Sequence, residues 1–415
     1  MRLKGVAARR PLPQPKGYPW GRFAHLPRWA GEPLALLEEG AALGPVFGLG
    51  LGRKAVVGYS PEWNRRLLTD LETFRSKGSF SSLTPYLNGG IITTDAPKHK
   101  PKRQELNPYF HAKALVGLKG RIRAALEERR PQGEFEANSW ASLVAQVSLN
   151  VAYFEGRFPA GELARFLAPL KRPFPAPLWP RPLLFAQVRR RVAQMQAAGF
   201  GLAAHLPGEE VLIGLAAGYD TTAHTLAWAL WHAACYPHWH TPEGHPLLIK
   251  ETLRLYPPGF IGSRRVAQAL EFDGYLIPKD SLVLYSPYLT HRHPDLWERP
   301  LAFDPSRFQG RIPAWGYLPF GGGERICLGM HFAQMVLEVA LSLFGSLEPL
   351  RGDPQPRPGS DPGAQGRTVA GLGSISGLTK SALVSCCRCP CLSTSSPKAT
   401  PTPQLVVGQH HDKDE

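Results

Sequence analysis

A single cysteine follows a run of glycines in the stretch from Phe320 to Gly329, which reads F-G-G-G-E-R-I-C-L-G. Three consecutive glycines do not hold a helix, so residues 321 to 323 predict a tight turn. The residues that follow, M-H-F-A-Q-M-V-L-E-V-A-L-S-L-F, have helical periodicity and place Cys327 near a helix N-terminus. Such a position lowers the pKa of a thiol and favours the thiolate, the form that binds metal. The stretch therefore predicts a loop that presents Cys327 to a metal, with Arg325 placed to pair with a carboxylate.

A second unusual stretch lies inside a long apolar helix pattern from about residue 209 to residue 234. Its centre, residues 217 to 222, reads A-G-Y-D-T-T, and glycine, aspartate and threonine are all poor helix formers. Together, inside an apolar helix, they indicate a local distortion with a function. The alternative is a helix that is kinked for packing.

Two further pairs of charged residues have the spacing of one helical turn. His99 and Arg103 are four residues apart and could point at one anion, although the surrounding lysines also fit an exposed basic face. Glu251 and Arg254 form E-x-x-R, an ion pair on one helix face. Such pairs occur on many solvated helices, so this one gains weight only from the motifs around it.

The spacing F-x-x-G-x-R-x-C-x-G resembles the cysteine loop of the cytochrome P-450 family, the haem-thiolate monooxygenases, and the chain is most similar to the soluble bacterial type. The resemblance covers about residues 43 to 350. It implies haem b (iron protoporphyrin IX) as cofactor and Cys327 as the iron ligand. The cofactor-binding positions that it implies besides Cys327 are Arg325, Phe320, Gly323, Gly329, Gly218, His99, Arg103 and Arg265, with Arg264 a close rival of Arg265.

The same resemblance gives roles to the other motifs. Asp220 and Thr221 correspond to the acid and the alcohol that deliver protons to dioxygen, because cleavage of the O–O bond needs two protons in a site with little free water. Arg307, in F-D-P-S-R-F, joins Glu251 and Arg254 in a charged triad. This triad has a structural role, since an arginine–carboxylate network suits the fixing of a long irregular segment.

The expected fold is mostly α with a small β portion. Residues 44 to 58 predict two strands joined by a turn, followed by a helix at about residues 61 to 68, and residues 115 to 206 are helical in character. We expect a basic, proline-rich arm over residues 1–42, a haem domain over 43–350 and a disordered tail over 351–415. The tail has no aromatic residue, so the C-terminal strands of the family are expected to be missing or replaced.

The net charge of +15 leaves three interpretations open. No recognition motif supports nucleic-acid binding. A basic face could receive an acidic ferredoxin or flavodoxin, which passes on electrons from its reductase, and a solvated surface without a partner fits equally well. With no apolar segment that could serve as a membrane anchor, the chain is expected to be cytoplasmic.

Histidines are frequent between residues 224 and 245, which invites a metal site. Only His224 and His232 share a helix, two turns apart. His238, His240 and His245 follow in a segment rich in proline and glycine. We interpret the five as scattered surface histidines.

These features predict a haem-dependent monooxygenase that inserts one oxygen atom of O2 into a C–H bond of a small apolar substrate, such as a fatty acid, another lipid or a carotenoid. Two rivals remain. A peroxide-driven peroxygenase would use the same fold. A haem-binding relic or sensor would fit the expected loss of the C-terminal strands.

Overall fold

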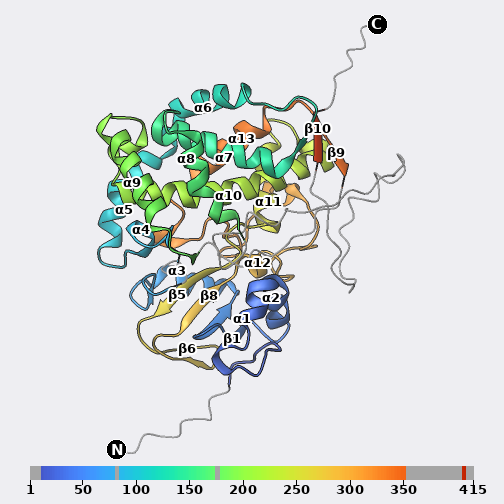
Figure 1. The fold of residues 1–415 in the computed structure, drawn as a ribbon. Coiled ribbons are helices and arrows are strands. Elements are labelled where there is room, and N and C mark those ends of the chain that lie inside the picture. Colours follow the sequence, from blue (N-terminus) through green and yellow to red (C-terminus); the bar gives the residue numbers. More distant parts are fainter. Residues whose placement is uncertain (1–10, 80–83, 173–177, 352–403, 408–415) are drawn as a thin grey trace, which may run out of the picture.

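The structure is a computed structural model that describes residues 11–79, 84–172, 178–351 and 404–407. Figure 1 shows a larger helical region above a smaller region of strands and short helices. This arrangement confirms the predicted mostly α fold with a small β portion. Within the described ranges, no helix combines the length and the apolar composition that crossing a bilayer requires.

The α-helices, in chain order, are α1 (Leu26–Gly31), α2 (Pro33–Ala41), α3 (Pro61–Thr69), α4 (Gly90–Thr93), α5 (His99–Phe110), α6 (Ala112–Glu127), α7 (Ala137–Phe154), α8 (Ala160–Leu167), α9 (Pro182–Ala197), α10 (Gly208–Cys235), α11 (His245–Leu255), α12 (Pro287–Thr290) and α13 (Met330–Leu341). The 3-10 helices are η1 (Gly21–Phe23), η3 (Ala168–Lys171), η5 (Leu202–His205), η6 (Pro237–Trp239), η7 (Pro305–Gln309) and η8 (Gly323–Arg325).

The strands form three sheets. A mixed sheet has the order β1-β2-β8-β5-β3, in which β2 and β8 are parallel and the other neighbours antiparallel. Its strands are β1 (Val46–Gly50), β2 (Lys54–Gly58), β3 (Phe74–Arg75), β5 (Gly262–Val266) and β8 (Leu282–Tyr285). The antiparallel hairpin β1–β2 and the helix α3 confirm the prediction for residues 44 to 68. The two smaller sheets are the pair β6 (Leu270–Phe272) and β7 (Tyr275–Ile277), and β4 (Glu134–Glu136) with β10 (Gln404–Val407) and β9 (Leu347–Arg351).

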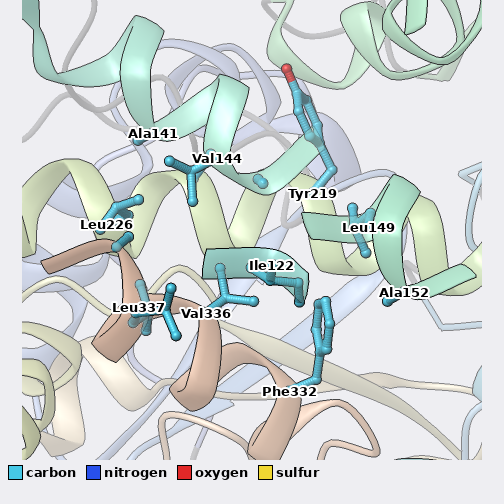
Figure 2. Close-up of a cluster of buried hydrophobic side chains, with 14 of the residues drawn as sticks. Ile122, Ala141, Val144, Leu149, Ala152, Tyr219, Leu226, Phe332, Val336 and Leu337 are labelled. Carbon is cyan, nitrogen blue, oxygen red and sulfur yellow. The ribbon is translucent and has the colours of Figure 1, made fainter. Parts of the chain in front are cut away.

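Helix α10 is 28 residues long and runs through the helical region, as the apolar pattern of residues 209 to 234 predicted. Because it is apolar on almost every side, it can be surrounded by other helices. Figure 2 shows the buried side chains where α10 meets α6, α7 and α13. The labelled residues there are Ile122, Ala141, Val144, Leu149, Ala152, Tyr219, Leu226, Phe332, Val336 and Leu337.

The N-terminal residues are more structured than the expected arm over 1–42. Helices α1 and α2 bury Trp29, Leu36 and Leu37 in one cluster with Phe47 of β1 and Leu284 of β8. The packing therefore has no boundary at residue 42, and this part of the expectation is corrected. The proline-rich composition hid two short helices, each of which has a proline in its first turn, where a missing N–H costs little.

The C-terminal residues contain a strand where none was expected. Strand β10 pairs with both β4 and β9, and Leu405 is fully buried in the helical core cluster. The expectation of a strandless end beyond residue 350 is therefore wrong for residues 404–407, because Q-L-V-V is a short apolar run of good strand formers. The rest of the expected disordered tail, residues 352–403 and 408–415, lies outside the described residues.

The position of Leu405 predicts how strongly β10 stabilises the fold. Leu405→Ala removes buried methyl groups, so we expect the free energy of unfolding to fall by about 2–4 kcal/mol in urea denaturation. Val116→Ala is the control, because Val116 is 73% exposed and its change should stay within about 0.5 kcal/mol. Equal stability of the two variants would show that β10 does not pack as described.

Candidate functional site

The glycine turn before Cys327 is present as predicted. Gly321 and Gly323 have φ angles of +71° and +64°, the left-handed region that favours glycine. A Cβ on residue 323 would lie 2.4 Å from the carbonyl oxygen of Leu68, at the end of α3. The close approach of this turn to α3 therefore requires glycine at position 323.

Cys327 is held by the backbone of the same loop. Its N–H donates to the carbonyl of Phe320 at 2.9 Å. The side chain has accessible surface, yet enough protein surrounds it for burial to raise the pKa of the thiol. Both statements hold if the sulfur faces an internal space. A hydrogen bond from the backbone of Gly329 and the charge of Arg103 lower the pKa, but burial outweighs them.

The expected lowering of the Cys327 pKa is therefore not what the protein chain alone produces. Helix α13 begins at Met330, three residues after the cysteine. The effect of the helix dipole falls off within about one turn, and burial opposes the charged form. A metal cation bound to the sulfur would favour the ionised form of this thiol.

Helix α5 directs two side chains at the loop that carries Cys327. His99 is 2% exposed, and its Nδ1 lies 2.5 Å from Oε1 of Glu324. Arg103 donates from Nη1 to the carbonyl of Ile326 at 2.5 Å. The pair is thus one helical turn apart and points at one place, as the spacing suggested. Pro101 disturbs nothing because it is the third residue of α5, where no helical N–H bond is lost.

Arg325 and Arg264 bring two guanidinium groups close together. Arg325 donates to the carbonyl of Thr94 and lies 3.2 Å from Oδ1 of Asp95, with only 6% of its side chain exposed. Burial, followed by repulsion from Arg264, lowers the pKa of Arg325 to about 10. The Nε atoms of both arginines are buried and have no hydrogen-bond partner among the described residues. The surrounding residues therefore leave part of the positive charge of this pair unbalanced and one N–H donor of each arginine unpaired.

Arg265 lies elsewhere, which corrects the sequence-based choice between the two arginines. Its guanidinium pairs with Asp280 and donates to the carbonyl of Lys77 at 3.3 Å. Successive side chains of a strand point to opposite faces, so β5 turns Arg264 toward Arg325 and Arg265 toward the surface. The alternation was visible in the sequence, but which residue faces inward depends on how β5 pairs with β8 and β3.

One face of α10 keeps some accessible surface. Between residues 211 and 234 every residue is buried except four, Gly214, Ala217, Gly218 and Thr221, which share one helix face at spacings of three and four. Thr221 donates from Oγ1 to the carbonyl of Ala217 at 2.6 Å. Asp220, next to it, is 2% exposed. We call these four residues the α10 stripe.

Tyr153 on α7 lies between the α10 stripe and the surroundings of Cys327 in an electrostatic sense. A Cβ on Gly214 would lie 2.1 Å from the hydroxyl of Tyr153 on α7, so this hydroxyl touches the stripe. The pKa of Tyr153 is raised by burial and further by Glu210 and Cys327. Gly218 has a different neighbour, because its Cβ would lie 3.0 Å from Leu149. The structure therefore gives Gly218 a part in the close packing of α10 on α7.

The charged triad is formed, and two of its three members are fully buried. Arg254 donates to both carboxylate oxygens of Glu251, at 2.7 and 2.8 Å, and neither side chain is exposed. Arg307 adds a third contact to Glu251 at 3.1 Å. Sequence reasoning missed a fourth participant, the fully buried His291, which contacts Arg254 and the loop before Cys327. Its sequence context, T-H-R-H-P, gave no local signal of this role.

The histidines near α10 also differ from the expectation. His224, His232 and His245 are buried, so they are not surface residues. His232 contacts Thr252 at 3.0 Å and stacks on Phe303, which explains a polar ring inside the core. No group of three metal-binding side chains occurs in the part of the chain that the structure describes.

Known proteins resemble this chain over part or most of its length. The family model described as cytochrome P-450 matches residues 246–345. Cyclooctatin synthase from Streptomyces melanosporofaciens is 26% identical over 432 aligned residues, which cover 83% of this chain and 92% of that protein. Cytochrome P-450 3A2 from Rattus norvegicus is 35% identical over 158 residues, 32% of this chain and 31% of the relative. The chain thus spans about a third of the rat and hamster relatives that it matches.

Solved structures agree with this fold. The crystal structure of CYP175A1 from Thermus thermophilus has a TM-score of 0.68 at 24% identity, covering 80% of this chain and 92% of that chain. A six-coordinated cytochrome P-450 from another strain of Thermus thermophilus has a TM-score of 0.65 at 26% identity, covering 77% and 92%.

The chain belongs to the cytochrome P-450 family. Membership implies iron protoporphyrin IX as the cofactor, and the residues of this P-450 fit that group. The Cys327 thiol keeps accessible surface although burial raises its pKa, and the α10 stripe is a partly accessible face of an otherwise buried helix segment. The Nε atoms of Arg264 and Arg325 have no hydrogen-bond partner among the described residues. The two propionates of a porphyrin are anions that could accept these hydrogen bonds.

Arg264 and Arg265 form a matched pair for testing the propionate assignment. A hydrogen bond to an ionised group contributes about 1.5–3 kcal/mol, so we expect Arg264→Ala to lose haem to an apomyoglobin acceptor about 10- to 100-fold faster. Arg265→Ala should stay within about twofold, since it breaks only a partly exposed ion pair. Faster haem loss from Arg265→Ala than from Arg264→Ala would reverse the assignment.

Proposed function

We propose that this P-450 is a monooxygenase that hydroxylates a C–H bond of a small apolar substrate. One oxygen atom of dioxygen enters the C–H bond, and the other leaves as water after the uptake of two electrons and two protons. A single observation supports the proposal: Thr221 lies on the partly accessible face of α10, and Tyr153, which touches that face at Gly214, has its pKa raised in part by Cys327. We take this as support for a metal ligand and a proton-carrying hydroxyl around one reacting centre.

When bound, the haem supplies dioxygen activation, which a thiolate ligand promotes. We assign Cys327 as the iron ligand, with the Gly329 backbone stabilising negative charge on its sulfur. Phe320 and Gly323 shape the loop around this ligand. The residues that we assign to the propionates are His99, Arg103, Arg264 and Arg325.

Proton delivery falls to Asp220 and Thr221. The Thr221 hydroxyl donates to the Ala217 carbonyl, and its oxygen can still accept a hydrogen bond. By rotating, the same hydroxyl can instead donate a proton to a group beside the stripe. Asp220 is the preceding residue and is buried, and we assign it as the acid that replaces that proton. This pair favours dioxygen as the oxidant over peroxide, which brings its own protons.

For the substrate, we propose a fatty acid, another lipid or an isoprenoid such as a carotenoid. The side chains that pack around α10 are mostly apolar. The buried rings of Tyr86, Phe166 and Phe185 pack together where α8 and α9 meet the segment before α4. A carbon skeleton without charge suits such surroundings.

For the electrons, we propose a ferredoxin or flavodoxin with its reductase. Lys98 and Lys100 are exposed on either side of His99, whose ring contacts Glu324 in the Cys327 loop. An acidic protein bound there would stand close to the iron ligand. The net charge of +15 favours such an encounter.

The two rivals differ from this proposal in what they consume. A peroxygenase forms product from peroxide but not from dioxygen with reduced ferredoxin. A haem-binding relic or sensor forms product from neither. The relic or sensor was suggested by the expected loss of the C-terminal strands, and the presence of β10 weakens that reason.

The ligand assignment predicts the spectrum of the reduced carbon monoxide complex, because its main absorption band reports thiolate ligation. We expect wild-type protein expressed with ample haem to show the thiolate band and Cys327→Ser to lose it completely. Cys235→Ser, at the other cysteine of the described residues, should keep it. An unchanged spectrum in Cys327→Ser would refute the proposed function.

The proton assignment predicts different behaviour of two adjacent threonines. Thr221→Val keeps the shape but removes the hydroxyl, so we expect about a tenfold or larger loss of product per NADH, with more peroxide released. Thr222→Val should keep wild-type coupling, since its buried hydroxyl has no partner among the described residues. The assay uses a ferredoxin system with palmitic acid or β-carotene. Unaltered coupling in Thr221→Val would remove this residue from the relay.

A further inference from the structure

His291 connects the helix of the charged triad to the loop that precedes Cys327. It directly follows α12 and is fully buried. Its Nδ1 lies 3.1 Å from the carbonyl oxygen of Arg254, and its Nε2 lies 2.7 Å from the backbone nitrogen of Leu318. The carbonyl of His291 in turn accepts a hydrogen bond from Nη1 of Arg254 at 2.7 Å. Arg254 and His291 therefore hold each other reciprocally.

These partners allow only one state of the imidazole. A carbonyl oxygen can only accept, so Nδ1 must carry a hydrogen. A backbone N–H can only donate, so Nε2 must carry none. The neutral ring with its hydrogen on Nδ1 satisfies both partners. A protonated ring would place an N–H of its own against the N–H of Leu318, and that bond would be lost.

Backbone hydrogen bonds lead from this imidazole to the cysteine. The carbonyl of Leu318 accepts from Gly321 at 3.0 Å, and the carbonyl of Phe320 accepts from Cys327 at 2.9 Å. Beside them, the Tyr317 hydroxyl donates to the carbonyl of Lys250 on α11 at 2.9 Å. Residues 315–320 have no helix or strand of their own, so these few bonds fix the position of the turn.

We propose that His291 is a positioning residue whose neutral imidazole fastens the segment before Cys327 to α11, and whose protonation releases that segment and ends thiolate ligation. The inference rests on the proposed function, because it takes Cys327 as the iron ligand.

The surroundings of His291 set the direction of its pH dependence. Burial, reinforced by the charges of Arg254 and Arg292, lowers its pKa to about 3, against the opposing effect of backbone carbonyls. The other titratable ring beside it is Tyr317, at 5.3 Å, whose pKa burial raises. In the released segment the pKa returns to about 6.5. Below that value the released form binds a proton that the fastened form excludes, so each pH unit favours release about tenfold.

The test follows the thiolate band of the reduced carbon monoxide complex as the pH is lowered. In His291→Gln the side chain can still donate and accept but does not titrate in this range, so the band should persist to lower pH than in the wild type. In His291→Ala both partners are left unpaired, so loss of the band at neutral pH should be about tenfold faster.

A third variant keeps the imidazole and changes only its surroundings. Arg292→Gln removes a neighbouring positive charge and thus makes protonation of His291 easier. A higher pKa in the fastened form makes smaller the difference in proton binding that drives release. The band should therefore be lost at the same or a lower pH than in the wild type, never at a higher one, which tests the inference even if both His291 variants fail to fold.

Two other histidines serve as controls. His232 is also buried, with a pKa lowered to about 3, but contacts Thr252 and not the cysteine loop. His293 is two residues away and partly exposed. His232→Gln and His293→Gln should both keep the wild-type midpoint of band loss. An equal shift in His232→Gln, no shift in His291→Gln, or loss of the band at higher pH in Arg292→Gln would overturn the inference. A wild type without a thiolate band at any pH would instead refute the proposed function.

Discussion

The ion pairs of the Glu251 carboxylate, which is buried between two arginines, are the interaction on which the cysteine site depends. The carboxylate accepts two hydrogen bonds from Arg254, one from Arg307 and one from the backbone of Asp304. A buried pair of this kind contributes little net stability compared with apolar residues, but removal of one partner leaves an uncompensated charge and is costly. The network therefore constrains the fold, because any arrangement that separates Glu251 from its arginines leaves a buried charge without a partner.

What the network constrains is backbone that has no regular structure. Arg254 donates to the carbonyls of His291, Pro300 and Ala302, and Arg307 donates to those of Glu298 and Ala302. Buried carbonyls without partners are expensive, so the guanidiniums replace the hydrogen bonds that a helix or sheet would have provided. The same device extends through His291 to Leu318, which places the glycine turn and then Cys327.

The sequence was sufficient wherever a role depends on near neighbours in the chain. The spacing of Glu251 and Arg254, the glycines before Cys327 and the apolar pattern of α10 all predicted what the structure contains. Arg264 was second choice because a strand's inward face is set by its pairing with β8 and β3. His291 was missed because its partners are 37 residues before it and 27 residues after it. Strand β10 was missed because it is separated from β9 by residues 352–403, and four residues carry little periodicity.

Electrostatics also gives a reason why binding of the cofactor would stabilise the folded state of this protein. Arg264 and Arg325 repel each other in a buried place, and the Cys327 thiol is kept neutral by burial. Two propionates would relieve the first cost, and a metal cation would reverse the second by favouring the thiolate. In the proposed assignment each charged part of a haem would meet a group whose own burial is otherwise unfavourable. Since binding to the native state alone stabilises it, haem binding and folding of the cysteine loop would then be coupled, with His291 at the point where the triad and the loop meet.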